Sequence, residues 1–185
     1  MFIILIFFVF LQAVVVALFL LYVVSSVISD IKGAPYVPLQ KKYVRWLVDI
    51  FPLTAGSVFY DLGSGDGRVV FAVTRRYDLR KAVGYEYAPW PYWKSRLFKK
   101  IYHMSSVVFY HADMRNASLR DADVIYLYLY PKLIDSMIKI IGQQVRDGTI
   151  IVCPRFKIDC SKHTQFKLLK EIHYQSLPVF LFQKR

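Results

Sequence analysis

One stretch decides the fold of this 185-residue chain: Val58-Phe59-Tyr60-Asp61-Leu62-Gly63-Ser64-Gly65-Asp66-Gly67-Arg68-Val69-Val70. The apolar run from Val58 to Leu62 predicts a buried strand. The three glycines then interrupt any regular pattern, and apolar residues at helical spacing follow from Asp66, which we predict to be the N-cap of a helix. A glycine turn between a strand and a helix N-terminus is the outline of a nucleotide-binding loop.

The spacing of the glycines distinguishes between kinds of loop. A dinucleotide fingerprint requires G-x-G-x-x-G, and here Arg68 stands where the third glycine belongs. The Gly-Lys-Ser/Thr of a phosphate-cradling loop is also missing. An acid at the strand end followed by G-x-G-x-G resembles motif I of the seven-β-strand methyltransferases, which bind S-adenosylmethionine (SAM). SAM carries no phosphate, so its loop needs no anion clamp, and Asp61 could hold its ammonium group.

The rest of the chain alternates between strand-like and helix-like patterns. After a helix over 40–51 and the opening strand, we expect strands at 82–85, 107–111, 123–130 and 149–153, with helices between them, and a final antiparallel hairpin at 167–176 and 179–183. This order predicts an α/β fold, the Rossmann-like seven-β-strand methyltransferase fold, preceded by a transmembrane helix. Ligands of such sheets lie at the carboxyl ends of the strands.

Acidic residues end three successive predicted strands. Asp61 ends the first, Glu86 the second and Asp113 the third. A carboxylate at the second position can accept both ribose hydroxyls of a nucleoside. Asp113 could accept the adenine amino group, with Met114 packed on the ring. The alternative for each acid is a solvated side chain at a strand end.

Aromatic residues supply the candidate walls of the site. Trp90 and Trp93 could line the cofactor pocket or enter a membrane interface, and core packing is favoured for Trp93. Tyr126, Tyr128 and Tyr130 alternate along the fourth strand and share one face. The hydroxyl or carbonyl of Tyr130 could orient an acceptor amine, and the alternative is that the tyrosines only pack against helices.

The N-terminal segment predicts a membrane anchor. Residues 2–24 are apolar apart from Gln12, and a helix of this length spans about 34 Å, enough to cross a bilayer. A cleaved signal peptide and a buried core helix are the weaker alternatives. No Lys or Arg precedes the segment, and four basic residues follow it, which places the remainder of the chain in the cytoplasm: Lys32, Lys41, Lys42 and Arg45.

We therefore divide the chain into an anchor at 1–30, a linker with the helix before the first strand at 31–56, and a methyltransferase domain at 57–185. The net charge of +12 favours anionic lipid or nucleic acid as a partner. Because the predicted anchor would place the domain at a bilayer, lipid is the favoured partner, and no nucleic acid is expected. The two cysteines and four histidines show no ligand spacing, so we predict no metal site.

Four motifs in one order carry a family resemblance: Pro-Tyr-Val-Pro at 35–38, Asp-Leu-Gly-Ser-Gly-Asp-Gly-Arg at 61–68, Val-Gly-Tyr-Glu at 83–86 and Pro-Trp at 89–90. With the apolar N-terminus, they resemble the membrane-anchored lysine methyltransferases that include the ATP synthase c-subunit and adenine nucleotide translocase enzymes and their prokaryotic relatives. The resemblance implies that Tyr36 lies in a segment closing over the cofactor and the reacting amine. The expected cofactor-binding residues are Asp61, Gly63, Ser64, Gly65, Glu86, Tyr87, Trp90, Asp113 and Met114, and the expected catalytic residues are Tyr36 and Tyr130.

The resemblance implies a SAM-dependent protein-lysine N-methyltransferase that releases S-adenosyl-L-homocysteine and acts on a membrane protein. We expect a single-pass protein of a prokaryotic plasma membrane, with the mitochondrial inner membrane as the alternative, because no Arg-rich presequence is visible. The rival functions are methylation of a lipid or quinone, methylation of nucleic acid, and SAM binding without catalysis.

Overall fold

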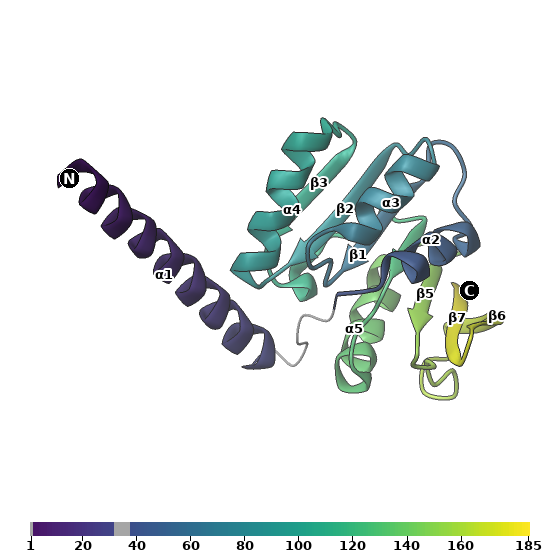
Figure 1. Cartoon of the computed structure of the whole chain (residues 1–185). Coiled ribbons are helices and arrows are strands. Elements are labelled where there is room, and N and C mark those ends of the chain that lie inside the picture. Colours follow the sequence, from purple (N-terminus) through teal and green to yellow (C-terminus); the bar gives the residue numbers. More distant parts are fainter. Residues whose placement is uncertain (1, 32–37) are drawn as a thin grey trace.

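The computed structural model describes residues 2–31 and 38–185 of the chain (Figure 1). Its helices are α1 (Phe2–Ile31), α2 (Lys41–Ile50), α3 (Arg68–Arg76), α4 (Pro89–Tyr102) and α5 (Pro131–Gln144), with a short 3-10 helix at Met114–Asn116. Its strands are β1 (Val58–Leu62), β2 (Lys81–Glu86), β3 (Val107–His111), β4 (Val124–Tyr126), β5 (Ile150–Pro154), β6 (Phe166–Tyr174) and β7 (Leu177–Lys184).

The strands form one seven-stranded sheet in the order β3-β2-β1-β4-β5-β7-β6. The strands β1 to β5 are parallel to one another, and β7 pairs antiparallel with both β5 and β6. The predicted terminal hairpin is therefore confirmed, and so is the predicted fold class. Strand order reverses between β1 and β4, which makes the carboxyl end of β1 the topological switch point where ligands bind in such sheets.

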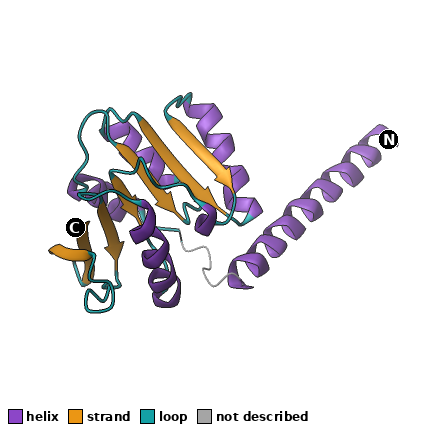
Figure 2. Ribbon diagram, turned by 180° about the vertical axis from the view of Figure 1, so that it is seen from behind, coloured by secondary structure: helices purple, strands orange, loops and turns teal. Residues whose placement is uncertain are grey.

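Helices cover both faces of the sheet (Figures 1 and 2). Phe59 and Tyr126 point to the face covered by α2 and α3, whereas Tyr60 and Leu127 point to the face covered by α5. All five residues of β1 are buried, because a central parallel strand is covered on both sides. The apolar run in the sequence reflects this double burial.

The register brings the predicted ligand residues to one edge of the sheet. Asp61 lies opposite Gly84 of β2 and opposite Tyr126 of β4. Glu86, the last residue of β2, lies opposite His111 of β3. Parallel pairing thus places the strand-end acids at a common edge, as the sequence predicts.

Helix α1 runs away from the domain (Figure 1). Its stretch Phe2–Val27 is long and apolar enough to cross a membrane, and its large side chains are exposed, with Phe2 at 74% and Phe19 at 62%. A buried core helix would not show this exposure, so that alternative is wrong. Near its end, α1 meets the start of α4, where the backbone N–H of Trp90 donates to Oγ of Ser25 at 2.8 Å.

The start of α3 corrects one prediction. Asp66 is not the N-cap, because the helix begins at Arg68 and the cap position is Gly67, with φ 77° and no side-chain capping bond. The third glycine of the turn takes the left-handed conformation that a side chain would disfavour. Asp66 instead forms ion pairs with Arg68 at 2.7 Å and Lys94 at 3.1 Å.

Two further predictions differ from the structure. The fourth strand was expected over 123–130, but β4 ends at Tyr126 and Tyr130 is already the N-cap residue of α5. The expected core packing of Trp93 is also wrong, since 61% of this residue is exposed on α4. An aromatic residue on an amphipathic helix usually faces the core, but α4 packs against the domain through the face that carries Pro91 and Ser95.

Substitution of Gly67 by alanine should destabilise the fold in two ways. The positive φ costs about 1 kcal/mol, and the new Cβ would lie 2.8 Å from Cε1 of Phe109, an overpacking that costs about 1–3 kcal/mol. Gly56 is a matched control, with φ 79° and open space around the added Cβ. Urea unfolding of the full chain in detergent should show a larger loss for Gly67→Ala than for Gly56→Ala, and equal losses would contradict the packing argument.

Candidate active site

Backbone N–H groups of the glycine turn after β1 are bound within the protein. The N–H groups of Gly63 and Ser64 both donate to the carbonyl of Tyr85 at 2.9 Å. The N–H of Gly65 donates to the carboxylate of Glu86 at 2.8 Å. A phosphate-binding loop would keep these donors for the anion, so this turn does not have the geometry of a phosphate cradle.

Buried carboxylates give this end of the sheet a negative character. Asp61 is only 2% exposed, and burial raises its pKa well above the usual value, with the charges of Glu86 and Asp66 adding to the effect. Burial also raises the pKa of Glu86, although N–H donors from Ala88 and Gly65 partly oppose the shift. A cationic ligand at this position would lower the energy of both ionised groups.

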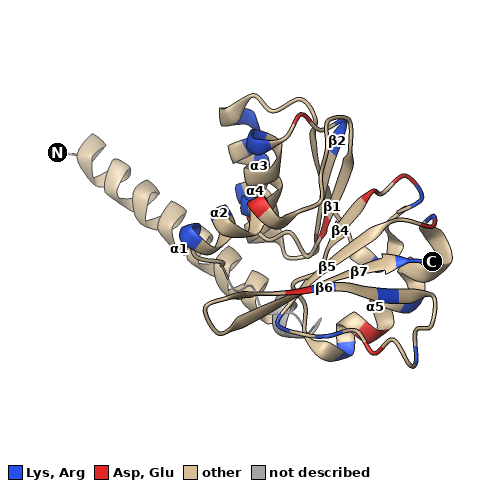
Figure 3. Cartoon of the chain, turned by 90° about the vertical axis from the view of Figure 1, so that its right-hand side faces the viewer, with Lys and Arg blue, Asp and Glu red and all other residues tan. Residues whose placement is uncertain are grey.

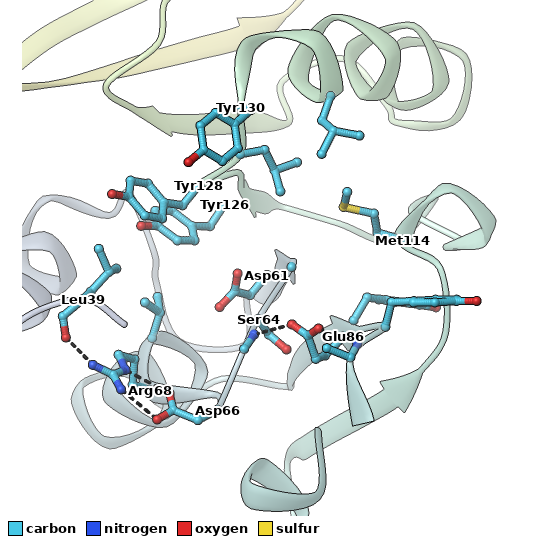
Figure 4. A pocket seen from close by; sticks show the side chains of 18 of the residues that line it. Leu39, Asp61, Ser64, Asp66, Arg68, Glu86, Met114, Tyr126, Tyr128 and Tyr130 are labelled. Carbon is cyan, nitrogen blue, oxygen red and sulfur yellow. Dashed lines mark hydrogen bonds and ion pairs between the residues drawn. The ribbon is translucent and has the colours of Figure 1, made fainter. Parts of the chain in front are cut away.

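A cavity of about 350 Å³ opens at this edge of the sheet (Figure 4). Most of the predicted site residues line it: Asp61, Gly63, Ser64, Gly65, Glu86, Tyr87, Asp113, Met114 and Tyr130. Trp90 is not among its lining residues and is half-buried where α4 meets α1. Tyr36 lies outside the residues that the structure describes.

The adenine-side candidates occupy the short helix after β3. Asp113 caps this turn, and its carboxylate accepts from the backbone N–H of Arg115 at 3.0 Å and from its guanidinium. A carboxylate oxygen can accept a further hydrogen bond beyond those to one arginine. Met114 is partly buried against the core cluster that contains α5, so its thioether forms an apolar wall of the cavity.

Three tyrosines form the wall opposite Ser64 and Glu86 (Figure 4). Tyr126 and Tyr128 keep a common face even though β4 ends at Tyr126, since both pack with the α2 and α3 cluster. Tyr130 is 47% exposed at the cavity. Its carbonyl accepts from the backbone N–H groups of Leu133 and Ile134 in the first turn of α5. Of the hydroxyl and the carbonyl that were expected to orient an amine, the hydroxyl is therefore the one available.

Two buried hydroxyls in the cavity wall lack a hydrogen-bond partner among the described residues: Oγ of Ser64 and the hydroxyl of Tyr126. Unsatisfied buried polar atoms are uncommon in folded proteins and suggest a missing ligand or water. Burial raises the pKa of Tyr126 well above its usual value, so its hydroxyl stays protonated and can donate. The cavity therefore offers acceptors for a cation and a hydroxyl that can donate or accept a hydrogen bond.

Other residues that line the cavity include the arginines Arg155 and Arg68. Arg155 follows β5, lines the cavity and donates to the hydroxyl of Tyr128 at 3.3 Å. The guanidinium of Arg68 donates to the carbonyl of Leu39 and pairs with Asp66. This hydrogen bond holds the segment 38–40, which precedes α2, over the cavity. Arg68 departs from the dinucleotide fingerprint and ends the motif at 61–68 that carries the family resemblance, but nothing in the sequence spacing links it to Leu39.

A metal site is not evident in the parts of the chain that the structure describes, where no three His, Cys, Asp or Glu residues gather in a group able to hold an ion.

The sheet order and the cavity at its switch point define the class of Rossmann-like methyltransferases. An RNA methyltransferase from Salinibacter ruber, solved in complex with S-adenosyl-L-homocysteine, superposes with a TM-score of 0.71 at 27% identity, covering 80% of this chain and 94% of that one. The B. subtilis tRNA methyltransferase TrmK superposes with a TM-score of 0.66 at 13% identity, covering 81% and 68%.

Within this class, residues 61–165 match the ANTKMT methyltransferase domain, and the chain belongs to that family. This confirms the resemblance found in the sequence. The adenine nucleotide translocase lysine N-methyltransferase of Mus musculus is 32% identical over 125 residues, 67% of this chain and 54% of that protein. The ATP synthase c-subunit lysine N-methyltransferase of Homo sapiens is 29% identical over 124 residues, 66% of this chain and 52% of that protein.

A protein-lysine N-methyltransferase of Saccharolobus islandicus is 38% identical over a shorter stretch of 58 residues, 31% of this chain and 36% of that protein. The chain thus spans about half the length of the two mammalian relatives and little more than a third of the Saccharolobus protein.

Loss of the Arg68 guanidinium should release the segment over the cavity. A hydrogen bond from a charged group contributes about 1.5–3 kcal/mol, so Arg68→Ala should speed amide hydrogen exchange of a peptide covering 38–44 by about tenfold or more. Arg76→Ala is the control, because Arg76 pairs at 3.4 Å with Asp49 and both side chains are over 60% exposed, where an ion pair contributes little. Equal exchange in the two variants would show that Arg68 does not hold the segment.

Proposed function

We propose that this protein is a SAM-dependent protein-lysine N-methyltransferase that acts on a membrane protein at the cytoplasmic surface. The observation that carries the proposal is the acidic cavity in an otherwise basic chain. Asp61 and Glu86 lie beside a glycine turn with no phosphate-binding geometry, and the neighbouring Asp66 is paired with Arg68 and Lys94, although the whole chain carries +12. Such a cavity favours a cationic, phosphate-free ligand.

The cofactor side of the cavity fits SAM in its donor set. When bound, SAM supplies a methyl group activated on a sulfonium. We assign the SAM ammonium to Asp61, the ribose hydroxyls to Glu86 and the adenine to Asp113 and Met114. Each carboxylate oxygen of Glu86 already accepts one N–H, at 2.8 Å from Gly65 and 2.7 Å from Ala88. These bonds hold the carboxylate in place while its remaining lone pairs face the cavity.

The acceptor side is assigned to the tyrosine wall. A lysine amine must lose its proton before it can attack, which costs roughly 4–5 kcal/mol at pH 7. The rings of Tyr126, Tyr128 and Tyr130 remove water from the amine, and the guanidinium of Arg155 beside them repels an ammonium ion. Both effects lower the pKa of the bound lysine. Tyr36, which precedes the described segment 38–185, is proposed to close this side.

The membrane is proposed as the place of action. Exposed apolar side chains along α1 support a membrane-spanning anchor over residues 1–30, joined through 31–56 to the methyltransferase domain at 57–185. Basic residues after the span support a cytoplasmic domain, where SAM is made. We propose a prokaryotic plasma membrane, with the mitochondrial inner membrane as the alternative. The names of both mammalian relatives, which specify lysines of the ATP synthase and the adenine nucleotide translocase, support a membrane-protein substrate.

Nucleic acid is the second candidate substrate. The Salinibacter relative is an RNA methyltransferase of similar fold, and the net charge of +12 would attract a phosphate backbone. The family match and the curated relatives favour lysine instead. The assay described below separates these substrates by the fraction that takes up label.

SAM binding should release protons from the protein. Asp61 has a raised pKa in the ligand-free fold, and a bound ammonium returns that pKa toward its usual value. SAM affinity should therefore fall as the pH is lowered through the raised pKa, because protonated Asp61 must first lose its proton. Calorimetry of the full chain in buffers of different ionisation enthalpy should detect the release, and Asp61→Asn should abolish it. A pH-independent affinity would remove Asp61 from the site.

Methyl transfer should require the Tyr126 hydroxyl, which we assign to accept an N–H of the neutral amine, so that the amine lone pair points at the methyl group. Membranes from cells lacking the protein are incubated with labelled SAM and the full chain, and protein, lipid and RNA fractions are counted. We expect label as methyllysine in membrane protein. Tyr126→Phe should lower the rate by about tenfold, the equivalent of one hydrogen bond.

Tyr43→Phe is the matched control, because Tyr43 also carries a buried hydroxyl with no hydrogen-bond partner among the described residues but does not line the cavity. Removal of an unpaired buried hydroxyl should not weaken either fold. Label confined to lipid or RNA would overturn the proposed substrate, and an equal rate for both variants would remove Tyr126 from the acceptor side.

A further inference from the structure

Helix α4 presents an apolar stripe to solvent. Trp93, Leu97 and Ile101 are 61%, 56% and 55% exposed. Their spacing of four residues places them in one row along the helix. Pro91 and Ser95 are buried on another face, which packs against the domain. A row of large exposed apolar side chains on a surface helix indicates an interaction site.

Basic residues flank this stripe. The helix carries Lys94, Arg96, Lys99 and Lys100 and no acidic residue from Pro89 to Tyr102. The neighbouring α3 carries Arg75 and Arg76 in its last turn, and Figure 3 colours the Lys and Arg positions of the ribbon blue. Arg75 of α3 lies with its guanidinium 4.3 Å from the ring of Tyr102. A helix with an apolar row between cations has the composition of segments that lie on anionic membrane surfaces.

The candidate membrane span touches this same helix. Ser25 of α1 is buried and accepts the backbone N–H of Trp90, in the first turn of α4. From that contact α1 extends away from the domain on the side of α4 (Figure 1). If α1 crosses a bilayer, the first turn of α4 therefore lies beside the point where α1 leaves the domain.

We infer that α4 docks on the anionic surface of the membrane that α1 spans. Trp93, Leu97 and Ile101 enter the headgroup region, where tryptophan is favoured. Arg96, Lys99 and Lys100 contact lipid phosphates, whereas Lys94 stays paired with Asp66 at 3.1 Å. This inference deepens the proposed function and rests on it only in taking α1 as a membrane span. Tyr87 and Ala88, which immediately precede α4, line the cavity, so docking would hold the cavity at the membrane surface.

A second copy of the chain fits this surface less well. Pairing two α4 helices through the stripe would bring their cations together, because the helix carries basic residues and no acid. Lipid phosphates provide the opposite charge along the same row. Charge complementarity therefore selects an anionic bilayer as the occupant.

The test uses tryptophan fluorescence of the full chain in vesicles of phosphatidylcholine with or without phosphatidylglycerol. Lipids brominated near the headgroup quench tryptophans that lie at that depth. Trp93→Phe identifies the share of quenching that belongs to Trp93. Leu97→Glu interrupts the stripe, and Leu169→Glu is the matched control, because Leu169 is 46% exposed on β6, away from α4 in Figure 1.

We expect quenching of Trp93 in anionic vesicles and less in phosphatidylcholine alone or at high salt. Leu97→Glu should shift the ratio of docked to undocked protein by about tenfold or more, and Leu169→Glu should leave it unchanged. Unquenched Trp93, or equal effects of both substitutions, would overturn the inference. Conversion of a dimer to a monomer by Leu97→Glu with quenching unchanged would assign the stripe to a second copy instead.

Calorimetric SAM binding in the same samples separates the two proposals. Intact SAM binding with unquenched Trp93 would overturn only the docking of α4. Absent SAM binding with quenched Trp93 would overturn the proposed function and leave the docking surface standing.

Discussion

The burial of one carboxylate constrains the rest of this structure. Asp61 is part of a central strand whose five residues are all buried, and two further acids lie close enough to raise its pKa. Removing a charge from water costs several kcal/mol unless an opposite charge replaces the lost hydration. A cationic ligand would supply that opposite charge, and its binding would then also stabilise the folded state.

Two cations beside the glycine turn pair with a different acid. Arg68 and Lys94 both form ion pairs with Asp66, one residue before the cap of α3, so their two positive charges exceed the charge of that acid. This arrangement separates a negative interior from a positive exterior in one small domain. The interior selects for a cation, and the exterior attracts anionic surfaces. Net charge alone describes only the second of these properties.

The sequence predicted those features that depend on local pattern. Apolar runs located β1 and β3 at their observed ends, and the strand-end acids Asp61 and Glu86 followed from parallel pairing. The failures involve tertiary packing. Asp66 has the composition of an N-cap, but its carboxylate is drawn to two cations from other parts of the site. Trp93 has the spacing of a core residue, but which face of α4 meets the sheet is decided by the neighbouring helices.

The acceptor side of the cavity depends on the C-terminal hairpin, which no motif in the sequence connects with it. Arg155 adopts φ 69°, a left-handed conformation unusual for a side chain, and its N–H donates to the carbonyl of Pro178 in β7 at 2.8 Å. Such strain persists only where surrounding contacts enforce it. The same hairpin carries Tyr174, whose ring packs 5.2 Å from Tyr43 and 5.1 Å from Trp46 of α2.

One pair of strands thus fixes two opposite parts of the acceptor wall. It positions the guanidinium beside Tyr128, and it supports the helix that directly follows Leu39, which Arg68 holds over the cavity. The strands β6 and β7 follow the parallel strands in the sequence, and β7 pairs with β5. The residues assigned to the cofactor come from β1 to β5 and the loops between them. The residues assigned to the acceptor also need the contacts of the hairpin. Under the proposed function, the residues assigned to the acceptor side are therefore coupled to the C-terminal strands, and substitutions in those strands would act on that side without altering Asp61 or Glu86.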